Sequence, residues 1–521
     1  MGSLLPFVAL AVCLPRGLTR NCLPLQTAMS FKSLRSEGSL PSSPGQQAIS
    51  RSVTWPIILN LNSVLTLSRA IRQHLLNHQR TVYVGFDPTA RSLHLGNLVV
   101  LITLLHFTLK GHHAIILLGG ATGSVGDPSG RNSERVALSE NLLKSNLQSI
   151  HNQLDNLLSI SFKHASNTLL TVKNTLDSQP ITPSIPIIKN NLEWTENLTL
   201  LEFLESVGRI ARASTMLARD SVKQRLESGS GISFTEFTYQ LLQAYDFAQL
   251  RSKYQCTVQL GGSDQYGNIM SGIELMTKLQ NSSSSHDLGI GEKSVSSIQE
   301  SDSENLNVGF GLTVPLLTTR EGEKFGKSAG NAVWLDPHLT SPTFISIPDS
   351  EVFKYLKMLT FVPLEELEQR FENWKYLDKP DSKRELQKLL AKEVTLLVHG
   401  EKGLRQAIQG TEFLFPIERL DHHHHWTREK LDETFENSPN WIRLKASQVI
   451  GRPIGDLCVA SGLCLSKGEA RRTIKAGGIR LSHCAVTDFD QPVSHDHLFD
   501  STYLLLMRGK TAVYKMIKLI D

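Results

Sequence analysis

The sequence has 521 residues, which is too long for a single hydrophobic core, so we expect two or three folded domains. With 40% hydrophobic residues, 20% charged residues and a net charge of +4, the composition is that of a soluble globular protein, and so small an average charge does not decide whether an acidic partner binds. None of the six cysteines is spaced C-x-x-C, which excludes a zinc knuckle and a disulfide framework and predicts a reducing compartment. No apolar run reaches the roughly 18–20 residues of a membrane span, so we expect no membrane contact.

The N-terminal segment has the composition of an organelle transit peptide. No acidic residue precedes Glu37, and four basic residues are scattered among Ser, Leu, Thr and Pro: Arg16, Arg20, Lys32 and Arg35. The apolar run at 4–14 leaves a secretory signal as the alternative, but no basic residue precedes that run. We therefore assign residues 1–55 to a transit peptide with a linker and place the protein in the mitochondrial matrix.

Short apolar strands alternate with amphipathic helices over residues 80–275. Strands are predicted at 81–86, 114–118 and 257–260, with helices at 98–109 and from about 268. The second strand leads directly into a run rich in glycine. This alternation is typical of a parallel sheet whose ligands bind at the carboxyl ends of its strands. We predict a Rossmann-like α/β domain over residues 56–345.

The rest of the chain divides by composition. Residues 280–307 are rich in Ser, Glu and Asp, which predicts a disordered surface insertion. Apolar residues at helical spacing predict an α-helical domain over 346–420. Four adjacent histidines at 422–425 lack the fixed geometry of a metal site, so we interpret 421–447 as a linker. A small α+β unit follows at 448–521.

The first chemical motif runs from Tyr83 to Asn97 and reads YVGFDPTARSLHLGN. It leaves a strand, turns near Asp87 and Thr89, and enters a helix near His94. A helix N-terminus offers free N–H groups and positive potential, which suits a polyphosphate. Gly96 and Asn97 follow in the first turn, where a glycine lets a ring or backbone lie flat. The alternative is a surface histidine beside an ordinary turn glycine.

The second motif is a glycine-containing lysine pair, KFGKS, with Lys324, Lys327 and Ser328. Two ammonium groups on a mobile loop can close on a leaving pyrophosphate and neutralise its charge as it develops. The alternative for such a segment alone is a solvated charged loop.

In this order on an α/β domain, the two motifs resemble the HIGH and KMSKS signatures of class I aminoacyl-tRNA synthetases. Four stretches narrow the resemblance to the tyrosyl-tRNA synthetase family of bacterial and organellar type: 83–97, GGATGSVGDPSG at 119–130, FTEFTYQLLQAYDF at 234–247 and QLGGSDQYGN at 259–268. The likeness runs from about residue 81 to the C-terminus, interrupted by insertions.

The resemblance implies a tyrosine pocket. Residues matching Tyr83 and Asp246 hold the phenol hydroxyl, and residues matching Asp127, Tyr239 and Gln243 hold the ammonium group. The spacing within the stretch 234–247 supports this pocket, because Tyr239, Gln243 and Asp246 are i, i+4 and i+7 and would lie on one face of a helix.

The resemblance also implies an ATP site. Gly262 and Asp264 match residues at the ribose, and Gln265 matches one beside the tyrosine carboxylate and the reacting phosphate. The remaining expected ATP-binding or catalytic residues are Asp87, Thr89, His94, Gly96, Asn97, Lys324, Lys327 and Ser328. Asn97 replaces the last histidine of HIGH, and we expect its amide still to donate to the ribose. Arg91 stands where relatives often carry Asp, and no role is assigned to it.

The C-terminal unit resembles the S4 RNA-binding motif, with a basic helix and a Gly-Gly turn before a strand. Five basic residues are the expected RNA contacts: Lys467, Arg471, Arg472, Lys475 and Arg480. Clustered cations on a helix–turn–strand suit the phosphates of folded RNA. A solvated basic helix is the alternative.

By resemblance, then, the chain is a tyrosine–tRNA ligase with a Rossmann-like catalytic domain, a helical anticodon-binding domain and an S4-like domain. We expect L-tyrosine, ATP with Mg²⁺ and tRNA(Tyr) as substrates, no tightly bound cofactor, no protein-held metal and a homodimer. A tryptophanyl relative should lack Tyr83, Asp246 and the S4-like unit. A non-catalytic RNA-binding protein with a retained synthetase fold is the rival from another class.

Overall fold

We describe the protein from a computed structural model. The described residues are 69–129, 134–135, 137–170, 183–227, 229, 231–283, 309–318, 332–339, 347–376, 384–416, 426–435, 438–509 and 513–520. Three predicted features lie outside them: the transit peptide, the four histidines at 422–425 and the lysine motif at 324–328. Within the described part of the chain, no helix combines the length and the apolar character that crossing a membrane requires.

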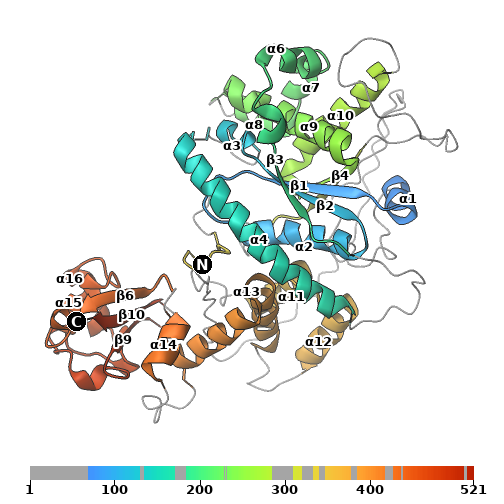
Figure 1. The fold of residues 1–521 in the computed structure, drawn as a ribbon. Coiled ribbons are helices and arrows are strands. Elements are labelled where there is room, and N and C mark those ends of the chain that lie inside the picture. Colours follow the sequence, from blue (N-terminus) through green and yellow to red (C-terminus); the bar gives the residue numbers. More distant parts are fainter. Residues whose placement is uncertain are drawn as a thin grey trace, which may run out of the picture.

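A five-stranded parallel sheet forms the centre of the α/β body, in the order β3-β2-β1-β4-β5 (Figure 1). Its strands are β1 Thr81–Phe86, β2 His113–Leu118, β3 Ile187–Asn190, β4 Cys256–Gly262 and β5 Phe310–Val314, each parallel to its neighbours. This confirms the predicted Rossmann-like sheet. The strand order reverses between β1 and β4, and in open parallel sheets such a point is where ligands bind.

Helices cover both faces of the sheet. They are α1 Arg69–Asn77, α2 Leu95–Leu109, α3 Thr122–Val125, α4 Glu140–Leu170, α5 Leu192–Thr195, α6 Leu200–Phe203, the π-helical turn η3 Leu204–Gly208, α7 Ala213–Leu217, α8 Asp220–Glu227, α9 Phe234–Tyr254, η4 Ser263–Gln265 and α10 Tyr266–Ser283. Residues of β1 alternate between the faces, because Val82 and Val84 share a core with α2 while Tyr83 packs with α9 and α10. The π-helical turn follows α6 directly.

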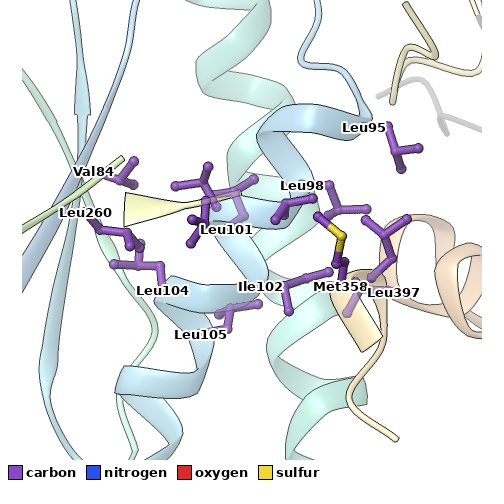
Figure 2. Close-up of a cluster of buried hydrophobic side chains, with 14 of the residues drawn as sticks. Val84, Leu95, Leu98, Leu101, Ile102, Leu104, Leu105, Leu260, Met358 and Leu397 are labelled. Carbon is purple, nitrogen blue, oxygen red and sulfur yellow. The ribbon is translucent and has the colours of Figure 1, made fainter. Parts of the chain in front are cut away.

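The helix α2 is buried on nearly all sides, which its almost wholly apolar sequence predicts. Figure 2 shows its leucines lying between Val84 and Leu260 of the sheet and Met358 and Leu397 of the downstream helices. Burying one such leucine contributes roughly 1.5–3 kcal/mol, so this layer is a large part of the stability of the body.

The downstream helices are α11 Asp349–Leu359, α12 Leu364–Tyr376 and α13 Glu385–Leu414. The sequence predicts a separate helical domain over 346–420, but these helices pack directly against the α/β body. Leu356, Leu359 and Leu390 belong to the same hydrophobic core as α2 and the sheet. The helical part and the α/β body therefore share one core.

The C-terminal unit is a second sheet in the order β6-β10-β9-β7-β8. Its elements are α14 Arg428–Phe435, β6 Trp441–Lys445, η8 Ala446–Gln448, α15 Ile454–Ala460, α16 Lys467–Lys475, β7 Ile479–Leu481, β8 Cys484–Ala485, η9 His495–His497, β9 Tyr503–Arg508 and β10 Val513–Ile520. Figure 1 shows this unit set apart from the α/β body at the far end of α13 and α14.

Two sequence boundaries need correction. The predicted linker 421–447 contains α14 and β6, and β6 pairs in parallel with β10, the last strand of the chain. That pairing is non-local, so no local pattern indicated it. The predicted insertion 280–307 begins inside α10, which continues to Ser283 because its apolar face packs against α9 and the sheet.

Candidate active site

The carboxyl ends of the central strands open into a cavity of about 390 Å³. Thirteen predicted site residues line it: Tyr83, Asp87, Thr89, His94, Gly96, Asn97, Asp127, Tyr239, Gln243, Asp246, Gly262, Asp264 and Gln265. They come from four separate stretches of the chain, which the sheet brings to one edge. Lys324, Lys327 and Ser328 lie outside the described residues, so their position is not part of this geometry.

His94 and Asn97 build the N-terminus of α2. The ring Nδ1 of His94 accepts the Gly96 N–H at 3.1 Å, and Oδ1 of Asn97 accepts the His94 N–H at 3.0 Å. Because Nδ1 accepts, the neutral ring carries its proton on Nε2 and can donate from there. Asn97 thus serves as a helix cap through its oxygen, while its amide nitrogen is the donor group of the side chain.

The segment after the lysine motif is attached to this helix start. The Leu95 N–H donates to the Val333 carbonyl and the Leu335 N–H to the Leu93 carbonyl, both at 2.8 Å. Trp334 lies between these bonds, lines the cavity and has its ring centroid 6.1 Å from that of His94. The chain that leaves the lysine motif is therefore fixed beside His94.

Asp87 lies under the glycine-rich turn. Its Oδ1 accepts the Thr122 hydroxyl at 2.7 Å and its Oδ2 accepts the Tyr239 hydroxyl at 2.9 Å. Burial, with the charge of Asp127 adding to it, raises the pKa of Asp87 to about 6. Gly119 permits this approach, because a Cβ there would lie 2.0 Å from Oδ1 of Asp87.

Asp127 marks one end of the cavity. Its Oδ1 accepts the Ser129 N–H at 2.9 Å, and its Oδ2 accepts the Gln265 amide at 2.8 Å. Gln265 is in turn 3.4 Å from the Gln243 amide, and the Oε1 atom of Gln243 is buried with no hydrogen-bond partner among the described residues. Acceptor oxygens of Asp127, Gln243 and the Tyr239 hydroxyl therefore line the same end, as an ammonium group requires.

Asp246 also lines the cavity and is only 3% exposed. It accepts the Trp194 indole N–H at 2.7 Å and the Asn191 amide at 3.0 Å. Burial raises the pKa of Asp246 to about 7, although these two donors favour the ionised form. The Tyr83 hydroxyl is also buried and makes no hydrogen bond to any described residue. Because a buried hydroxyl without a hydrogen bond is costly, Tyr83 together with the Asp246 carboxylate is suited to bind a polar ligand group.

Gly262 and Asp264 lie where β4 turns into η4 and α10, and both line the cavity. A Cβ on Gly262 would lie 2.6 Å from Oδ1 of Asp264, so glycine allows the carboxylate to fold back over the turn. Thr89 is in the turn after β1, where its N–H donates to the Asp87 carbonyl at 2.8 Å. No group of three or more His, Cys, Asp or Glu side chains suited to a metal occurs in the described part of the chain.

Sequence reasoning missed five residues of this site: Arg135, Asn191, Trp194, Gln259 and Trp334. Gln259 is opposite Tyr83 across β1 and β4, and its buried amide oxygen has no partner among the described residues. The only signal was a polar residue in an apolar setting: Asn191 directly follows β3, and Gln259 lies within the buried strand β4.

Four of the five basic residues predicted to contact RNA lie on α16, and the fifth, Arg480, lies on β7. Arg471, Arg472 and Lys475 are exposed, although the Arg471 guanidinium stacks over the Phe489 ring at 4.6 Å. Lys467 is paired with Asp456 at 2.7 Å, and Arg480 is half-buried on β7. The five predicted residues therefore differ in how accessible their charges are to RNA phosphates.

The parallel sheet, the HIGH-like helix start and the cavity between them define a class I aminoacyl-tRNA synthetase. The family model of tRNA synthetases class I (W and Y) matches residues 76–415, and that of the tyrosine–tRNA ligase SYY-like C-terminal domain matches residues 431–517. The chain belongs to the tyrosyl-tRNA synthetase family and is an ATP-using tyrosine–tRNA ligase. The second match also confirms that the C-terminal unit begins within the stretch predicted as a linker.

Individual relatives support the same family assignment. The chain is 39% identical over 457 residues to the mitochondrial tyrosine–tRNA ligase of Drosophila melanogaster, covering 86% of this chain and 90% of the relative. It is 39% identical over 448 residues to the tyrosine–tRNA ligase of the bacterium Protochlamydia amoebophila, covering 85% and 93%. A C-terminally truncated mitochondrial tyrosyl-tRNA synthetase of Aspergillus nidulans is similar in structure, with a TM-score of 0.52, 34% identity and coverage of 65% and 87%.

Proposed function

We propose that the cavity performs both steps of ligation. The tyrosine carboxylate attacks the α-phosphorus of ATP and pyrophosphate leaves. The terminal ribose hydroxyl of tRNA(Tyr) then attacks the tyrosyl carbonyl of the adenylate, and AMP leaves. The observation that carries this proposal is the convergence of thirteen predicted residues on one cavity. Pyrophosphate exchange with each of the twenty amino acids tests it, and exchange with tyrosine alone is expected. Absence of exchange with any amino acid would favour a non-catalytic RNA-binding protein.

Tyrosine is proposed to lie between the carboxylates of Asp127 and Asp246, which both line the cavity. The phenol hydroxyl donates to Asp246 and accepts from Tyr83, whose buried hydroxyl otherwise has no partner among the described residues. The ammonium group bonds to Asp127, Gln243 and Tyr239. Phenylalanine would leave the buried Tyr83 hydroxyl without a partner and would offer Asp246 no donor beyond Trp194 and Asn191, and an unpaired buried polar group costs about 1–3 kcal/mol. That cost supports rejection of phenylalanine without an editing site.

ATP is proposed to bind at the start of α2, with Mg²⁺ entering as part of the substrate. His94 donates to phosphate oxygens, Gly96 and Asn97 meet the nucleoside, and Asp264 with Gly262 meets the ribose. The N–H groups at the helix start favour the negative charge of the phosphates. Thr89, Lys324 and Lys327 stabilise the charge that develops as pyrophosphate leaves, so the site acts by positioning and electrostatics.

A homodimer is proposed through an apolar face. Exposed hydrophobic side chains gather on the short helices between β3 and α9: Leu200, Leu201, Leu204, Leu217, Leu226 and Phe234. Leu201 is 77% and Phe234 75% exposed, and the helices α6, α7 and α8 lie together on one side of the body (Figure 1). Large exposed apolar side chains on neighbouring helices favour an interface, and we assign it to a second copy of the chain.

The dimer is tested by the mass of the protein in solution. Leu200→Asp with Leu201→Asp should shift the mass towards that of a monomer. Leu465→Asp is the matched control, since Leu465 is 91% exposed on the C-terminal unit and outside the proposed interface. An unchanged mass for the first variant would remove this face from consideration.

A mitochondrial location is proposed from the basic, acid-poor N-terminus together with the mitochondrial relatives of Drosophila and Aspergillus. A bacterial relative is equally similar to the chain, so similarity alone does not indicate the mitochondrion. The N-terminal segment is therefore the feature that favours a mitochondrial location. Residues 1–55 fused to a fluorescent protein should direct it into the matrix. A cytosolic signal from that fusion would contradict the assignment.

A further inference from the structure

A buried ion pair lies just behind the ammonium end of the cavity. Nη2 of Arg225, on α8, is 3.0 Å from Oε2 of Glu236, in the first turn of α9, and both side chains are 2% exposed. Removing two charges from water costs several kcal/mol for each ion, and their attraction seldom gives a net gain. Stability alone is therefore a weak explanation for charges at these positions.

The second carboxylate oxygen of Glu236 points to a different role. Oε1 accepts the main-chain N–H of Arg135 at 3.0 Å. The Glu236 main chain is held by the N-cap Ser233, and Arg225 also donates from Nε to the Gly231 carbonyl at 3.1 Å. Glu236 thus connects α8 and α9 to the segment that carries Arg135.

Arg135 in turn touches the candidate site. Its Nε donates to the main-chain carbonyl of Asp127 at 2.8 Å, and the side chain lines the cavity. Its aliphatic part lies against Gly126, where an added Cβ would be 2.9 Å from Cδ of Arg135. Gly126 also has φ of +91°, which favours glycine. The main chain on both sides of the Asp127 carboxylate is therefore set by Arg135.

We infer that Glu236 is a positioning residue for tyrosine recognition, with Arg225 as the charge that holds it. Two hydrogen bonds lead from Glu236 through Arg135 to Asp127. When Oε1 of Glu236 is lost, Arg135 and the Asp127 main chain shift. The Asp127 carboxylate then no longer has the correct position and orientation to bind the ammonium group. Small displacements of a positioned group cost large factors in binding and rate. This inference rests on the proposed role of Asp127.

The test compares ligands with and without the ammonium group. 3-(4-Hydroxyphenyl)propionate is tyrosine without its ammonium group, and tyramine is tyrosine without its carboxylate, so tyramine shows whether the carboxylate contributes to the effect. Glu236→Ala should weaken tyrosine and tyramine binding by about tenfold or more while changing the propionate by less than about twofold. Glu236→Gln keeps an acceptor for the Arg135 N–H and should recover most of the loss. A general loosening of the fold would weaken all three ligands together.

Two double variants keep the test valid if Glu236→Ala does not fold. Arg225→Met with Glu236→Met replaces the pair by apolar side chains, a change that buried ion pairs often tolerate. Arg225→Met with Glu236→Gln removes the charges but retains the acceptor. The first should lose the preference for tyramine over the propionate, and the second should recover it. If the variant with Arg225→Met and Glu236→Met (the Met/Met variant) folds and still prefers tyramine over the propionate, the inference is wrong.

Asp127→Asn separates this inference from the proposed function. If Asp127→Asn loses the ammonium preference and the Met/Met variant keeps it, Asp127 binds tyrosine but Glu236 does not position it. If Asp127→Asn keeps the preference, the assignment of Asp127 itself is wrong, whatever the Glu236 variants do.

Discussion

The indole N–H of Trp194 donates to Oδ1 of Asp246 at 2.7 Å, and this bond orients one of the carboxylates that line the cavity. Asn191 holds the other oxygen, and it also donates to the Thr122 hydroxyl of the glycine-rich turn. The carboxylate is thus oriented by two hydrogen-bond donors of the protein itself. Such preorganisation makes Asp246 suited to recognise a single hydroxyl group.

Replacing Asp246 should reduce substrate discrimination. Asp246→Ala removes the partner of the phenol, so tyrosine activation should lose on the order of 1–3 kcal/mol or more, while the poor activation of phenylalanine should change much less. Pyrophosphate exchange with both amino acids measures the ratio. Unchanged preference for tyrosine would show that the phenol binds elsewhere.

The buried carboxylates predict a pH dependence of stability. The pKa of Asp246 is raised from 3.8 to about 7, so between these values the native state binds more protons than the unfolded chain. Its contribution therefore makes the unliganded protein less stable as pH rises from about 4 to about 7, with no further loss above that. Asp87, whose pKa is raised to about 6, acts in the same direction.

Asp246→Asn removes this titration. The free energy of unfolding of the variant relative to wild type should increase by about 1–3 kcal/mol between pH 5.5 and pH 8, measured by denaturant titration at both values. Any pH-independent cost of the substitution cancels in that comparison. Parallel curves for the two proteins would contradict the raised pKa.

Lys324 and Lys327 are expected to act late in the first step. Changing either to Ala should slow adenylate formation far more than it weakens tyrosine binding, because their charges meet pyrophosphate in the transition state. Single-turnover kinetics and equilibrium dialysis with tyrosine separate the two effects. A variant with weakened tyrosine binding and a normal rate would argue against a role of these two lysines in the transition state.

Local spacing predicted the parts of the site that lie on one continuous element. Tyr239, Gln243 and Asp246 share a face of α9, and His94 begins α2, as their sequence contexts indicated. These features depend on helical periodicity and on glycine-rich turns, which short windows of sequence reveal.

Contacts between distant segments were not predictable in this way. Trp194 and Asn191 follow the short edge strand β3 and reach Asp246 only because the sheet brings β3 and α9 together. The pairing of β6 with β10 likewise joins the start and the end of the C-terminal unit. Single-sequence patterns carry no information on such pairings, which is why β6 was assigned to a linker.

The position of β6 changes how the role of the C-terminal unit should be tested. Cutting the chain near Arg443 would divide β6 and leave half a strand. A cut after Pro416 instead removes the whole unit, including α14. It uncovers Phe413 and Leu414, which pack with Phe499 and Tyr503, so the mass of the product must be checked first.

The truncated chain should still form tyrosyl-adenylate, because every proposed tyrosine and ATP contact lies at or before Ser328. It should lose most tRNA charging. In the full chain, Arg471→Glu with Arg472→Glu should imitate that loss and flatten the salt dependence of tRNA binding, since fewer phosphates are neutralised. Lys445→Glu with Arg452→Glu is the control, because both side chains are exposed outside α16 and the change in net charge is equal. If the two double variants charge tRNA equally well, α16 is a solvated basic face and the RNA contact lies elsewhere.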